Sequence, residues 1–182
     1  AEMSLERWQD RIGRGDNRPW TELLADDVGS VDHDAVEATR RVRKNAITDA
    51  QPVQPGVVDL LDQADAHGLA TGVASSSPMS WVARHLERLQ LWSRFGTVKT
   101  RDLVARAKPW PDLFLAACDA LGADPARSVA LEDSVHGVAS AKAAGMYCVA
   151  VPNRVTSIGD FSDADLVLGS LEEFDLGAYV RR

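Results

Sequence analysis

The spacing of apolar residues changes once along this chain, near residue 50. Before that point apolar residues recur every three or four positions among charged ones, which predicts helices only in SLERWQDRIG, PWTELLADDVG and DHDAVEATRRVRKNAI. No strand-like run appears before about residue 68. The segment QPVQPG at 51–56 carries two prolines and a glycine, which favours a domain boundary or hinge.

Beyond residue 56, short apolar runs alternate with helical stretches of 10–15 residues. The predicted strands are LATGVAS, GTVKT, SVALE, MYCVAV and ADLVL. Strands that are apolar on both faces are typical of a parallel sheet with helices on each side. We therefore predict an α/β protein with a doubly wound parallel-sheet core at 51–182, preceded by a small all-helical domain at 1–50.

Composition narrows the possible partners and surroundings. Of the 182 residues, 45% are hydrophobic, which is enough for a buried core. The 20 basic and 27 acidic residues give a net charge of −7, which argues against nucleic acid as a partner. No apolar run approaches the about 20 residues of a membrane span, and the charged opening AEMSLERWQDRIG is unlike a signal peptide. With Cys118 and Cys148 in apolar stretches, we expect a cytoplasmic protein without nucleic acid or membrane partners.

Two loops that leave predicted strands carry groups suited to a phosphate, and ligands of parallel sheets bind beyond the carboxyl ends of the strands. In SSSP at 75–78, hydroxyls and free amides at a helix start suit phosphate oxygens. The alternative is that Ser77 is only an N-cap before a proline. Lys108 precedes a proline in a chain with 16 Arg and only 4 Lys, and its compact ammonium suits a phosphoryl oxygen. The alternative for Lys108 is a solvated loop lysine.

A third loop begins with two adjacent carboxylates, Glu132 and Asp133, directly after the predicted strand SVAL. Neighbouring carboxylates repel each other, and a hard cation such as Mg²⁺ relieves that repulsion by taking oxygen ligands. The alternative is ordinary acidic surface. Together the three loops supply hydroxyls, an ammonium and a cation site, which favours phosphoryl chemistry.

Three motifs in this order resemble those of the haloacid dehalogenase (HAD) superfamily, in its phosphatase and β-phosphoglucomutase-like branch with a helical cap. The stretch VASSSPMSWVARHLERL is similar to the second family motif and ARAKPWPDLFLAACDALG to the third. The stretch VALEDSVHGVASAKAAGMYCVAVPN is similar to the fourth motif and its continuation. The resemblance covers nearly the whole chain and implies a Rossmann-like HAD core.

The resemblance also implies a role for each candidate residue. Ser75 would hydrogen-bond the transferring phosphoryl group beside the Ser76 amide, and Lys108 would neutralise developing charge and hold the nucleophile. Glu132 and Asp133 would position Mg²⁺. Residues 1–50 would form most of the cap. The residues expected near the substrate leaving group are Arg14, Arg18 and Ser77.

The first family motif, an apolar strand followed by Asp-x-Asp-Gly, is not found in this sequence. Asp32-His33-Asp34 opens a predicted helix with no buried strand before it, so we interpret Asp32 or Asp34 as an N-cap. In the family the missing strand lies in the middle of the sheet and carries the nucleophile. We expect the natural polypeptide to carry it on upstream residues, and the chain alone to be inactive.

The resemblance implies a Mg²⁺-dependent phosphatase of a small phosphorylated metabolite such as a sugar phosphate, acting through an aspartyl phosphate. The partner would be a small phosphate ester, and the protein a monomer or weak homodimer. A phosphosugar mutase is the alternative enzyme, and a phosphate-binding module without a nucleophile is the alternative outside catalysis. A dehalogenase is disfavoured because carbon–halogen displacement has no use for the cation site.

Overall fold

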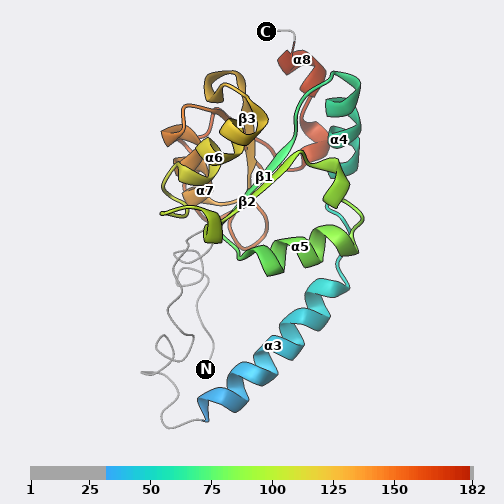
Figure 1. Ribbon diagram of the computed structural model, residues 1–182, viewed down its shortest axis with the longest axis vertical. Helices are drawn as coiled ribbons and strands as arrows, with labels where there is room; N and C mark the ends of the chain where they lie inside the picture. Colours follow the sequence, from blue (N-terminus) through green and yellow to red (C-terminus); the bar gives the residue numbers. More distant parts are fainter. Residues whose placement is uncertain (1–31, 181–182) are drawn as a thin grey trace.

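A computed structural model of the chain describes residues 32–180 (Figure 1). The first described helix, α3 (His33–Asp49), corresponds to the predicted helix DHDAVEATRRVRKNAI. Asp32 is its N-cap and accepts a hydrogen bond from the Ala35 amide at 3.1 Å. The interpretation of Asp32 as an N-cap is therefore confirmed.

The remaining elements follow the predicted alternation, although the strands are shorter than expected. The strands are β1 (Gly72–Ser75), β2 (Thr97–Thr100), β3 (Val129–Glu132), β4 (Tyr147–Ala150) and β5 (Leu166–Val167). The helices after α3 are α4 (Val57–Ala66), α5 (Met79–Arg88), α6 (Asp112–Leu121), α7 (Val135–Ala143) and α8 (Leu176–Val180). Single-turn helices are η1 (Trp92–Arg94), η2 (Arg101–Leu103), η3 (Pro125–Arg127) and η4 (Leu171–Glu173).

All strand pairs are parallel, but over residues 32–180 they form two sheets. One sheet has the order β1-β2 and the other has the order β3-β4-β5. Among the described strands, β1 therefore pairs along one edge only, and so does β3. The carboxyl-end residues Ser75 and Thr100 lie opposite each other in the first sheet, as do Glu132 and Ala150 in the second.

Alternating residues of β4 pack into two separate layers, which is what a doubly wound core requires. Cys148 and Ala150 lie in one hydrophobic cluster with Phe114 of α6, and Ala74 of β1 packs against it. Val149, between them, lies in the second cluster with residues of α4 and α8. Helices thus cover both faces, and α6 joins the two sheets because it also contacts β1, β2 and α7.

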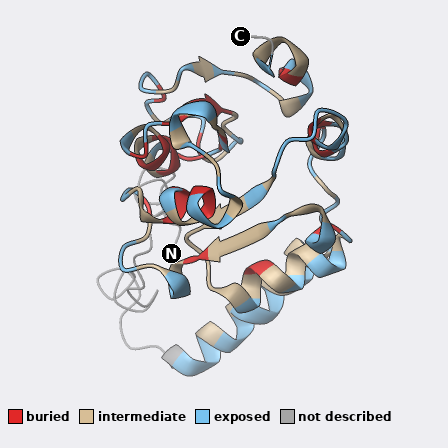
Figure 2. Ribbon diagram, turned by 45° about the horizontal axis from the view of Figure 1, so that its top comes forward, coloured by how far each residue is buried: buried red, intermediate tan, exposed pale blue. Residues whose placement is uncertain are grey.

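Helix α3 projects away from the two sheets and meets the rest of the molecule at its C-terminal end (Figure 1). Most of its residues are exposed (Figure 2). The segment 51–56, where we predict the domain boundary, lies between α3 and α4. Among residues 32–180, no helix has the length and apolar character needed to cross a bilayer.

Gly56 fixes the far end of this linker against the C-terminal part of the chain. Its φ is +81°, a left-handed value that favours glycine, and it is the N-cap residue of α4. A Cβ added there would lie 2.6 Å from the amide nitrogen of Glu172 and 2.7 Å from the carbonyl carbon of Leu171, both backbone atoms of η4. Only glycine lets the linker pass this close to η4.

We predict that Gly56→Ala destabilises the fold more than Gly68→Ala, a matched control. Gly68 also has a positive φ, +63°, but a Cβ there would meet nothing within 4 Å. Both variants lose the left-handed freedom of glycine, at about 1 kcal/mol, and Gly56→Ala must also shift η4, at about 1–3 kcal/mol more. Urea denaturation of both variants measures the difference. Equal losses would show that the contact with η4 is not tight.

Candidate functional site

The centre of the candidate site is a buried ion pair between Lys108 and Glu132. Lys108 lies in the loop between η2 and α6, and Glu132 is the last residue of β3. Each residue is 8% exposed, and the Lys108 ammonium donates to Oε1 of Glu132. The ammonium also lies 4.7 Å from the ring centroid of Phe114. Because a buried charge is costly without a partner, each residue makes the burial of the other possible.

The second carboxylate oxygen of Glu132 is held from the start of α7. The Ser134 hydroxyl donates to Oε2 at 3.3 Å and accepts from the Gly137 amide at 3.1 Å, so Ser134 is also the N-cap of α7. A Cβ at Gly137 would overlap the Glu132 carboxylate. Helix α7 therefore needs a glycine in its first turn in order to leave room for the Glu132 carboxylate.

Asp133, the neighbour of Glu132, is exposed and differs from it in every contact. Its Oδ2 accepts a hydrogen bond from the side-chain amide of Asn153 at 3.0 Å. Asn153 follows β4, so the ends of two adjacent parallel strands supply this contact. Sequence reasoning missed Asn153 as a site residue, and its position after the strand MYCVAV was the available signal.

The exposed carboxylate of Asp133 is compatible with binding a partly hydrated Mg²⁺ ion. Among residues 32–180, no group of three or more His, Cys, Asp or Glu side chains is arranged to hold a metal. However, Mg²⁺ keeps several waters and is usually bound by one or two carboxylates together with substrate phosphate. Asp133 fits this role because it is exposed, whereas the charge of Glu132 is balanced by Lys108.

The serine loop after β1 has a different geometry from the one the N-cap alternative requires. Helix α5 begins at Met79, and its N-cap is Pro78, which provides no side-chain hydrogen bond. The Met79 amide instead donates to Asp102, which follows β2, at 2.6 Å. The interpretation of Ser77 as the N-cap is wrong. The Ser77 amide donates to the Ser75 hydroxyl at 3.2 Å, so the loop closes on itself at the end of β1.

The structure thus brings some predicted site residues together and leaves others apart. Lys108 and Glu132 are in contact, and Asp133 follows directly. Ser75 ends a strand of the other sheet, with Ser76 and Ser77 after it, and its hydroxyl bonds within its own loop. The predicted residues Arg14 and Arg18 lie outside the described part of the chain.

The cysteines are buried and take no part in this site. Burial, and then the negative charges of Glu132 and Asp165, raise the pKa of Cys148 to about 12. Such a thiol stays protonated at neutral pH and is a poor nucleophile. Cys118 is buried in the same hydrophobic cluster. Nucleophilic chemistry by a cysteine thiol is therefore disfavoured in this region.

Known proteins resemble this chain over most of its length. The profile of the haloacid dehalogenase-like hydrolases matches residues 2–145. YhcW of Bacillus subtilis, which its name provisionally calls a phosphatase, is 39% identical over 176 residues, covering 96% of this chain and 80% of YhcW. Hexitol phosphatase B of Escherichia coli K12 is 34% identical over 141 residues, covering 75% of this chain and 64% of its own.

The fold is also found among solved structures. A variant of CbbY from Rhodobacter sphaeroides, crystallised in complex with xylulose-(1,5)bisphosphate, superimposes with a TM-score of 0.74 at 25% identity. The match covers 95% of this chain and 81% of CbbY. It agrees with the doubly wound arrangement of the described strands and helices.

We predict that Gly137→Ala destabilises the protein, against the usual helix preference for alanine. In a helix interior alanine is favoured by about 1 kcal/mol, but here its methyl group would displace the Glu132 carboxylate, at about 1–3 kcal/mol. Denaturant titration measures the sign. In a Glu132→Ala background the same Gly137→Ala change is expected to become neutral or stabilising, because the clashing group is gone. A stabilising effect in both backgrounds would contradict the contact.

We further predict that Lys108→Ala costs about 3–5 kcal/mol of unfolding free energy, because it leaves the Glu132 carboxylate buried and unpaired. Adding Glu132→Gln removes that charge and recovers part of the loss. The control is Arg106→Ala in the same loop, where the ion pair with Asp112 involves an arginine side chain that is 53% exposed; the expected loss is about 1 kcal/mol or less. Similar losses for both single variants would rule out a special role for the buried pair.

Proposed function

This chain belongs to the haloacid dehalogenase-like hydrolases, and from that premise we propose that it acts as a Mg²⁺-dependent phosphatase of small phosphorylated sugars. The observation that carries the proposal is the buried Lys108–Glu132 pair beside the exposed carboxylate of Asp133, at the carboxyl end of β3. An ammonium that is held rigidly, next to a carboxylate open to solvent, suits an anionic phosphate ester together with a cation.

Each proposed role follows from the chemistry of the group. Lys108 stabilises negative charge on the phosphoryl oxygens, and Glu132 is a positioning residue that holds the ammonium in place. Ser75 and the Ser76 amide bind the phosphoryl group at the start of the serine loop. Of the two predicted metal ligands, Glu132 and Asp133, we assign Mg²⁺ to Asp133, which Asn153 would orient, because the carboxylate of Glu132 is paired with Lys108. When bound, Mg²⁺ supplies Lewis-acid charge stabilisation at the phosphoryl oxygens.

The proposed nucleophile is an aspartate that is not among residues 32–180. The one-sided pairing of β1 and β3 supports a further strand between them, since buried backbone groups need hydrogen-bond partners. The aspartate oxygen bonds to phosphorus while the ester oxygen leaves with a proton from a second acid. Water then attacks the aspartyl phosphate, releasing inorganic phosphate and restoring the carboxylate.

The substrate class rests on the relatives. One is named a hexitol phosphatase, and the CbbY structure holds a sugar bisphosphate. A sugar phosphate places its phosphoryl group at Lys108 and Ser75 and leaves its hydroxyl groups to the residues that cover the site. We propose residues 1–50 as most of that cover, with Arg14, Arg18 and Ser77 near the leaving group.

The test uses protein expressed from its complete gene. We expect hydrolysis of p-nitrophenyl phosphate and of hexitol phosphates in Mg²⁺, with a fall of about 100-fold or more in excess chelator. Lys108→Ala should lose a factor of about 100 in kcat/KM, the scale of losing one group that stabilises transition-state charge. Ser75→Ala, which leaves the buried ion pair intact, should lose about 10-fold or more by the same reasoning. Arg106→Ala is the matched control and should retain activity.

Three results would overturn this assignment. Undiminished turnover in chelator would exclude the metal role, and undiminished turnover in Lys108→Ala would exclude the lysine role. Conversion of one sugar phosphate into its isomer without phosphate release would identify a mutase. Binding of phosphate without any turnover would identify a non-catalytic module. Circular dichroism of each variant separates lost chemistry from lost fold.

A further inference from the structure

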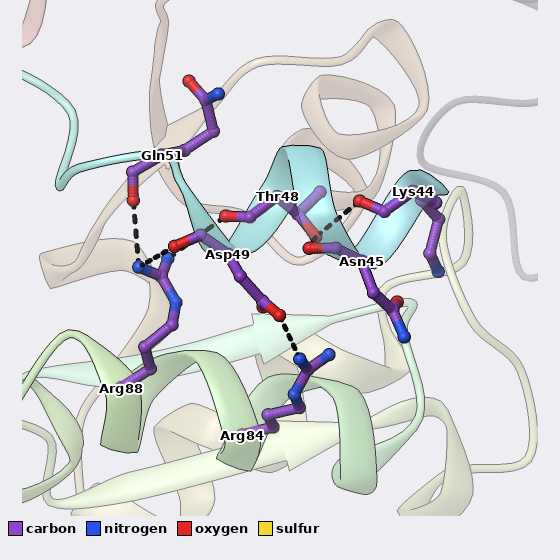
Figure 3. A network of polar contacts seen from close by, with 7 residues as sticks. All are labelled: Lys44, Asn45, Thr48, Asp49, Gln51, Arg84 and Arg88. Carbon is purple, nitrogen blue, oxygen red and sulfur yellow. Dashed lines mark hydrogen bonds and ion pairs between the residues drawn. The ribbon is translucent and has the colours of Figure 1, made fainter. Parts of the chain in front are cut away.

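One face of α5 carries Arg84 and Arg88, whose guanidinium groups contact the C-terminal end of α3 (Figure 3). Four residues, which we call the α5 stripe, lie along this helix: Trp81, Arg84, His85 and Arg88. They stand at positions i, i+3, i+4 and i+7, so they share one face of the helix. Val82, off this stripe, is buried in the molecule. The four side chains of the stripe can therefore contact a single neighbouring element together.

Arg88 binds three backbone carbonyls at the end of α3. Its Nη1 donates to the carbonyl oxygens of Asp49 and Gln51, both at 3.0 Å, and its Nη2 donates to that of Thr48 at 3.4 Å. The last turn of α3 contains no basic residue. Carbonyls at a helix end lack partners within the helix and carry partial negative charge. Arg88, which belongs to α5, thus supplies the positive charge that the last turn of α3 lacks.

Side-chain contacts extend this junction from Arg88 toward the start of α5. The Arg84 guanidinium pairs with the Asp49 carboxylate. The Lys44 ammonium lies 3.6 Å from the ring centroid of Trp81, and Trp81 packs edge-on against His85 with ring centroids 4.2 Å apart. Burial, and then the charges of Arg84 and Arg88, lower the pKa of His85. The imidazole is therefore neutral at pH 7 and adds no third positive charge to the stripe.

The other end of α5 adjoins the serine loop. The first helical residue, Met79, is held by Asp102, and only Pro78 separates it from Ser75 to Ser77. A helix of 10 residues is about 15 Å long and does not bend appreciably. Helix α5 therefore connects the proposed phosphate loop rigidly to the end of α3.

We propose that Arg84 and Arg88 are positioning residues that fix α3 relative to the serine loop. This inference rests on the proposed function, in which the loop binds phosphate and residues 1–50 cover the site. The Gln51 carbonyl is bonded to Arg88 and Gly56 lies in close contact with η4, so only residues 52–55 separate the two contacts. Order at the phosphate loop is thus transmitted through α5 to the C-terminal turns of α3.

The contribution of Arg88 should exceed that of Arg84. The Arg84–Asp49 pair is partly exposed, with side chains 44% and 34% accessible, and such pairs contribute little alone. Arg88 instead satisfies three carbonyl oxygens with one planar group, a geometry that lysine does not reproduce. Arg88→Lys should therefore recover part of the effect of Arg88→Ala, and not all of it.

Hydrogen exchange followed by mass spectrometry tests this on the full protein, with inorganic phosphate and Mg²⁺ as the probe. In the unmodified protein phosphate should slow exchange at 75–82 and at 42–51, each about threefold or more. In Arg88→Ala, exchange at 42–51 should be about tenfold faster without phosphate and should no longer respond to it, while 75–82 still does. Arg127→Ala, which removes the same charge from η3, is the control and should behave as the unmodified protein.

The phosphate site and its coupling to α3 are tested separately in this experiment. Protection at 75–82 without protection at 42–51 in the unmodified protein overturns the coupling and leaves the phosphate site standing. Protection at neither segment overturns the phosphate site of the proposed function. The role of Arg88 is then decided by exchange without phosphate, where an unchanged rate at 42–51 in Arg88→Ala overturns it.

Discussion

The buried ion pair between Lys108 and Glu132 is the constraint on which the rest of this structure depends. Two charges withdrawn from water cost several kcal/mol each unless they meet in good geometry. Here the lysine comes from the loop after β2 and the glutamate ends β3, so the pair ties together the two sheets of the described chain. Gly137 and the N-cap Ser134 follow from it, because α7 must begin beside the carboxylate.

The same pair separates the tasks of two adjacent acidic residues. Glu132, the last residue of β3, is buried, whereas Asp133, the first residue after the strand, is exposed. Glu132 uses its charge to hold an ammonium, and Asp133 keeps an exposed carboxylate beside Asn153. Repulsion between neighbouring carboxylates, the basis for expecting a cation site in the sequence, is therefore relieved in part by a lysine.

Sequence reasoning succeeded where a feature depends on nearby residues. The alternation of helices and strands, the N-cap at Asp32 and the burial of both cysteines all follow from local patterns. It failed for Ser77, because the acceptor at the start of α5 is Asp102, 23 residues farther along the chain. Asn153, Gly137 and Arg88 were not identified for the same reason: each matters only through a contact that the fold creates.

Two helix ends in this protein are completed by residues of other elements. Helix α5 has no side-chain cap of its own and receives Asp102, while α3 has no basic residue in its last turn and receives Arg88. Each helix end therefore has a hydrogen-bond partner that its own residues do not supply. Because α5 takes part in both contacts, its position is set by Asp102 of η2 and by α3 together. The proposed coupling between the serine loop and α3 depends on a helix held in this way, since neither end of α5 can move without losing a hydrogen bond to a charged group.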